Sequence, residues 1–316
     1  MKKCSECGSD NSSNSKFCQK CGNELSESKN SNSIFKVIAI ITLVIVIIAG
    51  ASLAYIIYFD VSPVEISYLN QKDSGNIYNN PALASNIPDS DNVGQMINLA
   101  GSGIPVFKIG DGTPPVTLIV AGVHGDQLSS QVASMQIIDY LSGRKISGTV
   151  YVIPFASPSA VAANTKLSNG INLNTVADEP GTISNDILNF AKINNVSALG
   201  DFHGTEPGKN PGKTTIMCSQ APCYESYLLA TEMNSYINQD TMTYMVAGIS
   251  YDGAIEDEAN IQGIPSVTPL VLSNHGQVND VSVQESLLQM LAILHANGNL
   301  NDDSYNKLAN ADIDGF

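Results

Sequence analysis

A run of twenty-three residues without a charge, Val37 to Phe59, constrains this chain more than any other feature. About twenty apolar residues in a helix are enough to cross a bilayer. A buried core helix of this length would show a polar face, and this run has none. The run is also too long for a cleaved signal peptide, and a cysteine-rich segment precedes it. The sequence therefore predicts a single transmembrane helix over 37–59.

Charge is divided unevenly on the two sides of this helix. Six lysines and four acidic residues precede position 37, whereas nine basic and twenty-six acidic residues follow position 59. Because lysine-rich flanks stay in the cytoplasm, we expect a single-pass protein of the cell membrane with a cytoplasmic N-terminus and an extracytoplasmic main domain. The acidic balance argues against nucleic acid as a partner, since that binding depends on Lys and Arg neutralising phosphates.

Four cysteines near the N-terminus have the spacing of a small zinc module. Cys4, Cys7, Cys18 and Cys21 form C-x2-C-x10-C-x2-C. Four thiolates satisfy the tetrahedral preference of Zn²⁺, and the metal can fold a segment too short for its own core. Two disulfides are the alternative, which a cytoplasmic location disfavours. The pattern predicts a structural zinc ribbon over 1–24, followed by a polar linker over 25–36.

Two further cysteines, Cys218 and Cys223, flank the sequence SQAP in the main domain. Outside the membrane an oxidised C-x4-C loop is one interpretation, and a pair of free thiols is the other. Metal binding by these two residues alone is the weakest of the three readings.

The chain beyond the membrane helix alternates strand and helix patterns. Residues 60–102 are rich in Ser, Asn and Pro, and we interpret them as a stalk or an irregular edge. Residues 103–300 predict an α/β domain with a mixed, largely parallel sheet and helices on both faces, and 301–316 a tail. The expected strands are 106–109, 116–123, 149–153, 198–203, 216–218, 243–247 and 266–272, and the expected helices are 127–141, 183–193, 224–237 and 281–294.

Two histidines follow predicted inner strands. Val116 to Val123 leads into His124, and the segment VSALGDFHG brings Asp201 and His203 to a second strand end. Because ligands bind at the carboxyl ends of strands in open α/β sheets, the pair predicts a metal site. One histidine at a strand end would more often have a structural role.

Four segments of this domain together resemble the succinylglutamate desuccinylase/aspartoacylase family, which has a zinc-carboxypeptidase-like fold. The similarity covers about residues 103–297. The segments are AGVHGD, GTVYVIPFASPSAVAANTKLSNGINLN, DFHG and GIPSVTPLVL, in the family's order and spacing. The resemblance implies zinc held by His, Glu and His, a water molecule on the fourth position, a glutamate base and arginines for the substrate carboxylate.

Carried over residue by residue, the resemblance makes His124 and His203 metal ligands and places Gln127 at the position of the glutamate ligand. Asp126 is an adjacent alternative. The catalytic glutamate falls near Leu270 and the substrate arginine on Thr175. Arg144, the one arginine in the sequence, is expected in a surface turn.

Other side chains complete the predicted site. Lys166, Asn172 and Asn174 of the substrate loop are candidates for ligand binding, and Asp201 is expected to orient His203. Glu206, His275, Glu256 and Glu258 are candidates to replace the missing groups, although each such residue is more often a solvated loop residue. The sequence assigns no catalytic residue.

Three functions remain open from the sequence. The first is a membrane-anchored, zinc-carboxypeptidase-like domain that binds a peptide, a wall-derived ligand or a small acyl-amino acid with catalysis impaired or lost. The second is an active zinc-dependent amidohydrolase with a rebuilt site. The third is a metal-free interaction scaffold. Fold resemblance alone does not decide among them.

Overall fold

The computed structural model describes residues 1–26, 31–59, 61–237 and 239–301, and within the first helix it describes the side chains of 35–53. The chain divides into two compact units, residues 1–59 and 60–316. The predicted tail, 301–316, lies outside the described residues except for Asn301.

The first unit contains the cysteine module and one long helix. Two antiparallel strands of two residues each, β1 (Lys2–Lys3) and β2 (Asp10–Asn11), pair in the cysteine module. Helix α1 (Ser31–Phe59) follows. It begins six residues before the predicted span, so 31–36 is helical where the sequence predicted linker. Residues 27–30, also assigned to the linker, lie outside the described residues. Among the described residues, α1 is the helix that is long and apolar enough to cross a membrane, with Phe35–Leu53 unburied.

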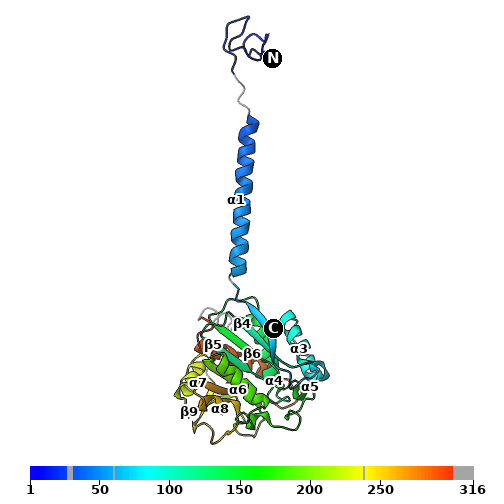
Figure 1. The fold of residues 1–316 in the computed structure, drawn as a ribbon, viewed down its shortest axis with the longest axis vertical. Coiled ribbons are helices and arrows are strands. Elements are labelled where there is room, and N and C mark those ends of the chain that lie inside the picture. Colours follow the sequence, from blue (N-terminus) through cyan, green and yellow to red (C-terminus); the bar gives the residue numbers. More distant parts are fainter. Residues whose placement is uncertain (27–30, 60, 238, 302–316) are drawn as a thin grey trace. The chain divides into compact units, whose positions relative to one another are not determined.

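The second unit is built on one mixed sheet with the strand order β10-β9-β11-β7-β5-β6-β4-β3, and a short strand, β8, also pairs with β11 (Figure 1). The central strands β11, β7, β5 and β6 are parallel to one another. The strands are β3 (Val64–Asn70), β4 (Ile104–Gly110), β5 (Val116–Val120), β6 (Thr149–Ile153), β7 (Ala198–Asp201), β8 (His203–Thr205), β9 (Thr215–Ala221), β10 (Asp240–Val246) and β11 (Ser266–Leu272).

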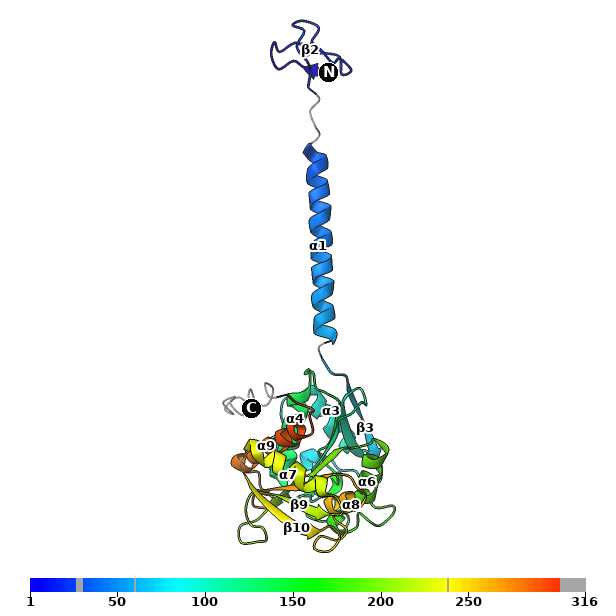
Figure 2. The same ribbon diagram turned by 90° about the vertical axis from the view of Figure 1, so that its left-hand side faces the viewer.

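Helices cover both faces of this sheet (Figure 1, Figure 2). In β5, Ile119 packs into the core layer under α3, α4, α7 and α9, whereas Leu118 and Val120 pack into the layer under α6 and α8. This alternation follows from the two-residue period of a strand. The helices are α2 (Pro81–Ala84), α3 (Asp91–Ala100), α4 (Leu128–Leu141), α5 (Pro158–Ala162), α6 (Ile183–Ile193), α7 (Tyr224–Ile237), α8 (Ile255–Ile261) and α9 (Asp280–Ala296), with 3₁₀ turns at Ile77–Asn79 and Leu173–Thr175.

The predicted stalk is part of the domain. Residues 64–70 form the edge strand β3, which pairs with β4 in an antiparallel register. The side chains of Ile77, Leu83 and Met96 are fully buried in the main core cluster. Of the two interpretations of 60–102, a stalk or an irregular edge of the domain, the described residues 61–102 agree with the edge. The polar composition concealed the few apolar residues that pack onto the core.

Candidate functional site

The four N-terminal cysteines converge as a metal-binding cluster. The Sγ atoms of Cys4 and Cys21 are 3.5 Å apart, as are those of Cys7 and Cys18, and all four sulfurs lie within 4.8 Å of one another. A disulfide needs about 2.05 Å between its sulfurs, so these distances exclude the two-disulfide alternative. A hydrogen bond from the Ser9 side chain lowers the pKa of Cys18 to about 5, which favours the thiolate that zinc requires.

Cys218 and Cys223 are free thiols in this structure. Their nearest partners are the Thr243 hydroxyl, 4.0 Å from Cys218 Sγ, and the Glu225 carboxylate, 3.6 Å from Cys223 Sγ. Burial raises the pKa of Cys218 to about 12. The oxidised loop that the sequence allowed is not formed.

A cavity of about 550 Å³ lies at the carboxyl ends of the parallel strands. The loop after β5 brings His124 there, β8 brings His203, the loop after β6 brings Lys166, and the loop after β11 brings His275. Gly125 lets the first loop pack against α5, because a Cβ there would lie 2.1 Å from the backbone of Ala160. Local sequence thus creates a tight turn that presents His124 inward.

The tautomer of His124 is set by its neighbours. Its Nε2 is 3.0 Å from Asn172 Oδ1, which also accepts the backbone N–H of Asn174 at 3.2 Å. Because Asn172 Oδ1 faces a backbone donor, the ring nitrogen must donate to it, which leaves Nδ1 of His124 with a free lone pair. This Nδ1 is buried and has no hydrogen-bond partner. Burial, reinforced by the neighbouring His203, lowers the pKa of His124 to about 3.

Gln127 lies between His203 and His275, and both the oxygen and the nitrogen of its side-chain amide contact polar atoms. Its Oε1 accepts from the backbone N–H of Gly204 at 3.0 Å and from Nδ1 of His203 at 2.8 Å. Since an N–H of the backbone can only donate, the oxygen is the atom at this place and His203 Nδ1 carries hydrogen. The amide Nε2 lies 3.4 Å from His275 Nε2. Gln127 Oε1 therefore holds His203 in place, whereas His275 Nε2 lies 3.4 Å from both the Gln127 amide nitrogen and the Gly204 carbonyl and can form a hydrogen bond with one of them at a time.

These residues do not fit a zinc ion as they stand. A zinc site of this type needs three donors with lone pairs directed at one point. His124 Nδ1 is one such donor, but Gln127 Oε1 and His203 Nδ1 satisfy each other. His203 Nε2 lies 3.0 Å from Asp201 Oδ2, and both atoms are buried without a hydrogen-bond partner. Within the described part of the chain, the four cysteines form the one group of three or more His, Cys, Asp or Glu donors close enough for a metal.

The remaining candidates fall into place around this centre. Asp201 lies against His203, and its orienting role stays a prediction; Asp126 Oδ2 lies 3.6 Å from Nδ1 of His275. The cavity is also lined by Lys166, Asn174 and Glu206 from the predicted set, together with Lys209 and Tyr251, which the sequence did not single out.

The positions that the resemblance marks as altered are apolar or remote. Leu270, where the family has its glutamate, is 8% exposed and lines the cavity. Arg144 packs over the Tyr140 ring at 4.0 Å, at the end of α4, and is not a lining residue. Thr175 is exposed and its hydroxyl donates to the Asn172 carbonyl at 3.0 Å.

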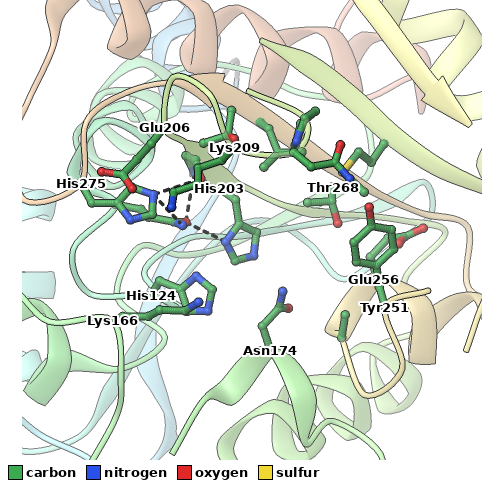
Figure 3. A pocket seen from close by; sticks show the side chains of 18 residues that line it. His124, Lys166, Asn174, His203, Glu206, Lys209, Tyr251, Glu256, Thr268 and His275 are labelled. Carbon is green, nitrogen blue, oxygen red and sulfur yellow. Dashed lines mark hydrogen bonds between the residues drawn. The ribbon is translucent and has the colours of Figure 1, made fainter. Parts of the chain in front are cut away.

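One group contradicts its sequence-based interpretation. Glu256 and Glu258 are 2% and 8% exposed in α8, not solvated loop residues. Glu256 lines the cavity opposite the histidines, beside Tyr251 and Thr268 (Figure 3). Burial, together with the nearby Asp257 and Asp201, raises the pKa of Glu256 well above its usual value. Apolar residues at 255 and 259 give α8 a buried face, a signal that the short length of the helix obscured.

Comparison with known proteins agrees with both units. Residues 3–25 match the family model of the zinc-ribbon domain. No curated protein matches the sequence.

Solved structures resemble the second unit. An aspartoacylase family protein from Mesorhizobium loti is 17% identical, with 77% of this chain and 69% of that chain covered and a TM-score of 0.52. The ectoine utilization protein from Ruegeria pomeroyi is 18% identical over 64% of each chain, with a TM-score of 0.52. Carboxypeptidase A from Helicoverpa armigera is 13% identical over 76% of this chain and 69% of its own, with a TM-score of 0.52.

At these identities the structural likeness establishes the fold. This fold, together with the four converging cysteines, assigns each of the two units to a structural class. The chain combines an N-terminal zinc ribbon with a domain of the zinc-carboxypeptidase-like fold that aspartoacylases and metallocarboxypeptidases share.

Proposed function

We propose that this protein is a single-pass membrane protein whose extracytoplasmic, carboxypeptidase-like domain binds a carboxylate-bearing ligand without hydrolysing it. The ligand is a peptide, a wall-derived fragment or a small acyl-amino acid. The observation that carries the proposal is the state of Gln127. A neutral amide, already bonded to His203 and Gly204, stands where hydrolysis would need a charged zinc ligand.

The cavity retains groups suited to an anion. Lys166 and Lys209 line it, and neither forms an ion pair within the described residues. Nine basic residues against twenty-six acidic ones follow position 59, whereas the cavity lining has two lysines beside Glu206 and Glu256, so the cavity is less negative than the domain as a whole. Asn174 adds an amide group to the same wall, and its Nδ2 is the atom that can donate to a carboxylate. The cavity favours this function over a scaffold without a ligand.

Ligand binding is tested with Nα-acetyl-L-norleucine and the full chain in detergent micelles. We expect saturable binding by calorimetry, weakened about tenfold by Lys166→Ala or Lys209→Ala, because each removes a charge-assisted hydrogen bond. Lys192→Ala, an equal charge change at an exposed residue of α6, is the control. Prolonged incubation should release no acetate. Release of acetate that depends on His124 would instead favour the rebuilt hydrolase.

The membrane arrangement has a separate test. The lysines before α1 predict that residues 61–301 lie outside the cytoplasm. Protease added to intact cells without an outer barrier should remove this domain and leave the N-terminal fragment protected. Protection of the whole chain until the cells are lysed would refute the proposed orientation.

A further inference from the structure

The end of the cavity opposite the histidines contains a buried carboxyl group that the proposed function does not use. Glu256, in the first turn of α8, lines the cavity and is 2% exposed. Met217, Ala254 and Leu270 form apolar wall at the same cavity. A ligand whose carboxylate meets the lysines could therefore extend an apolar stem toward Glu256 (Figure 3).

Hydrogen counting shows that this carboxyl group holds a proton when the cavity has no ligand. The Tyr244 hydroxyl is in hydrogen-bond contact with both Glu256 Oε2 and Asp257 Oδ1. A hydroxyl has one hydrogen, so one of these two contacts requires a protonated carboxyl group. Asp257 Oδ2 accepts the backbone N–H of Gly248 at 2.6 Å, which favours its charged form. The proton therefore belongs on Glu256, which is the carboxyl group with the raised pKa.

The surroundings of Glu256 lack a positive partner. In the described part of the chain, neither Glu256 nor Asp257 forms an ion pair with a lysine or arginine. Asp201, close enough for its charge to act on Glu256, is 1% exposed; its Oδ2 lies 3.0 Å from His203 Nε2, and its Oδ1 is buried without a hydrogen-bond partner. Buried charge normally has a counter-charge, so this end of the cavity is suited to a cation that the chain does not supply.

We propose that the Glu256 end of the cavity binds a primary ammonium group, so that the ligand carries a carboxylate at one end and an amine at the other. Glu256 releases its proton to solvent when the ammonium group arrives, and the two form an ion pair. Asn260 Nδ2, which donates to Glu256 Oε1 at 2.6 Å, keeps the carboxylate in place. This inference rests on the proposed function and narrows its ligand to an amino-acid-like or peptide-like compound with a basic side chain.

The test compares two probes that differ in the ammonium group, Nα-acetyl-L-lysine and Nα-acetyl-L-norleucine, on the full chain in micelles. The lysine probe should bind at least about tenfold more tightly to the unmodified protein, as expected of a charge-assisted hydrogen bond. Its binding should also release about one proton, seen as a dependence of the calorimetric heat on the buffer's ionisation enthalpy.

Glu256→Gln should abolish both the preference and the proton release while leaving binding of the norleucine probe within about twofold. Glutamine has the shape of the protonated acid and can keep the contacts with Asn260 and Tyr244, so the fold should survive, as a thermal melt would verify. The control is Glu258→Gln, which makes the same change two residues further along the same helix, at a side chain that does not line the cavity.

The outcomes separate the two proposals. Equal affinity of the unmodified protein for both probes would overturn the ammonium site and leave the carboxylate-binding function standing. A preference that persists in Glu256→Gln would overturn the assignment to Glu256. Failure of both probes to bind would overturn the carboxylate-binding function and the ammonium site with it.

Discussion

Replacing Gln127 with glutamate is expected to raise the zinc content of the full chain from about one to about two ions. The four cysteines account for the first ion. The second would bind between His124, the new carboxylate and His203. A carboxylate supplies the negative charge that the amide lacks and no longer requires His203 Nδ1 to carry hydrogen. His124 already offers a buried Nδ1 without a partner.

Binding of the second zinc ion should also raise the thermal stability of the Gln127→Glu variant. Zinc at about one hundred times its dissociation constant would stabilise the folded Gln127→Glu domain by about 2.7 kcal/mol. For a domain of this size that corresponds to a rise in Tm of about 5–10 °C. The measurements are metal analysis by mass spectrometry and thermal unfolding with and without zinc, with excess metal removed by gel filtration before the analysis.

A double variant, Gln127→Glu with His124→Ala, is the matched control, since it keeps the new carboxylate and removes the free nitrogen. It should return to about one zinc per chain. If the unmodified protein already held about two ions, the hydrogen-bonded state of Gln127 would not exclude zinc, and the non-hydrolytic function would lose its main support.

Substitution of Cys18 by serine is expected to unfold the zinc ribbon. The buried core of this module consists of Cys4, Cys18 and Leu25, which is too small to hold the segment without metal. Binding of structural zinc supplies about 10–16 kcal/mol in modules of this kind. Zinc content should fall from about one ion to none, and residues 1–26 should become sensitive to protease.

The second unit should keep its Tm in this variant, because the two units are separate compact bodies. Cys218→Ser makes the same chemical change in the second unit and should leave the zinc content at about one. Retention of zinc by Cys18→Ser would mean that three cysteines suffice, contrary to the four-thiolate site.

Strong local patterns in the sequence predicted the fold well. The strand 149–153, the helices 183–193 and 224–237, and the strand 266–272 have the boundaries that the sequence predicted. Pro154 ends the first of these strands, and apolar residues at helical spacing mark the two helices. Helices α3 and α8 were missed because they are short and their buried residues lie among polar ones.

The candidate site, like the fold, could be predicted from the sequence only in part. Its location followed from the sequence, because His124 and His203 come directly after buried strands, and parallel strands end at a common edge. The loss of the family's acidic residues was equally visible at Gln127 and Leu270. The hydrogen bonds of Gln127 could not be read from sequence, because their partners, Gly204 and His275, lie 77 and 148 positions away.

The sequence by itself determined that this chain has a four-cysteine zinc module, a helix able to span a membrane and an α/β domain with its site at the strand ends. Spacing and hydrophobic period are local properties, and they set these features directly. Only the tertiary structure decided that Gln127 Oε1 accepts hydrogen bonds from His203 and Gly204, and that Glu256 is buried in the cavity wall and shares a tyrosine with Asp257. Burial and proton sharing depend on groups brought together from distant strands, so they exist only once the chain has folded.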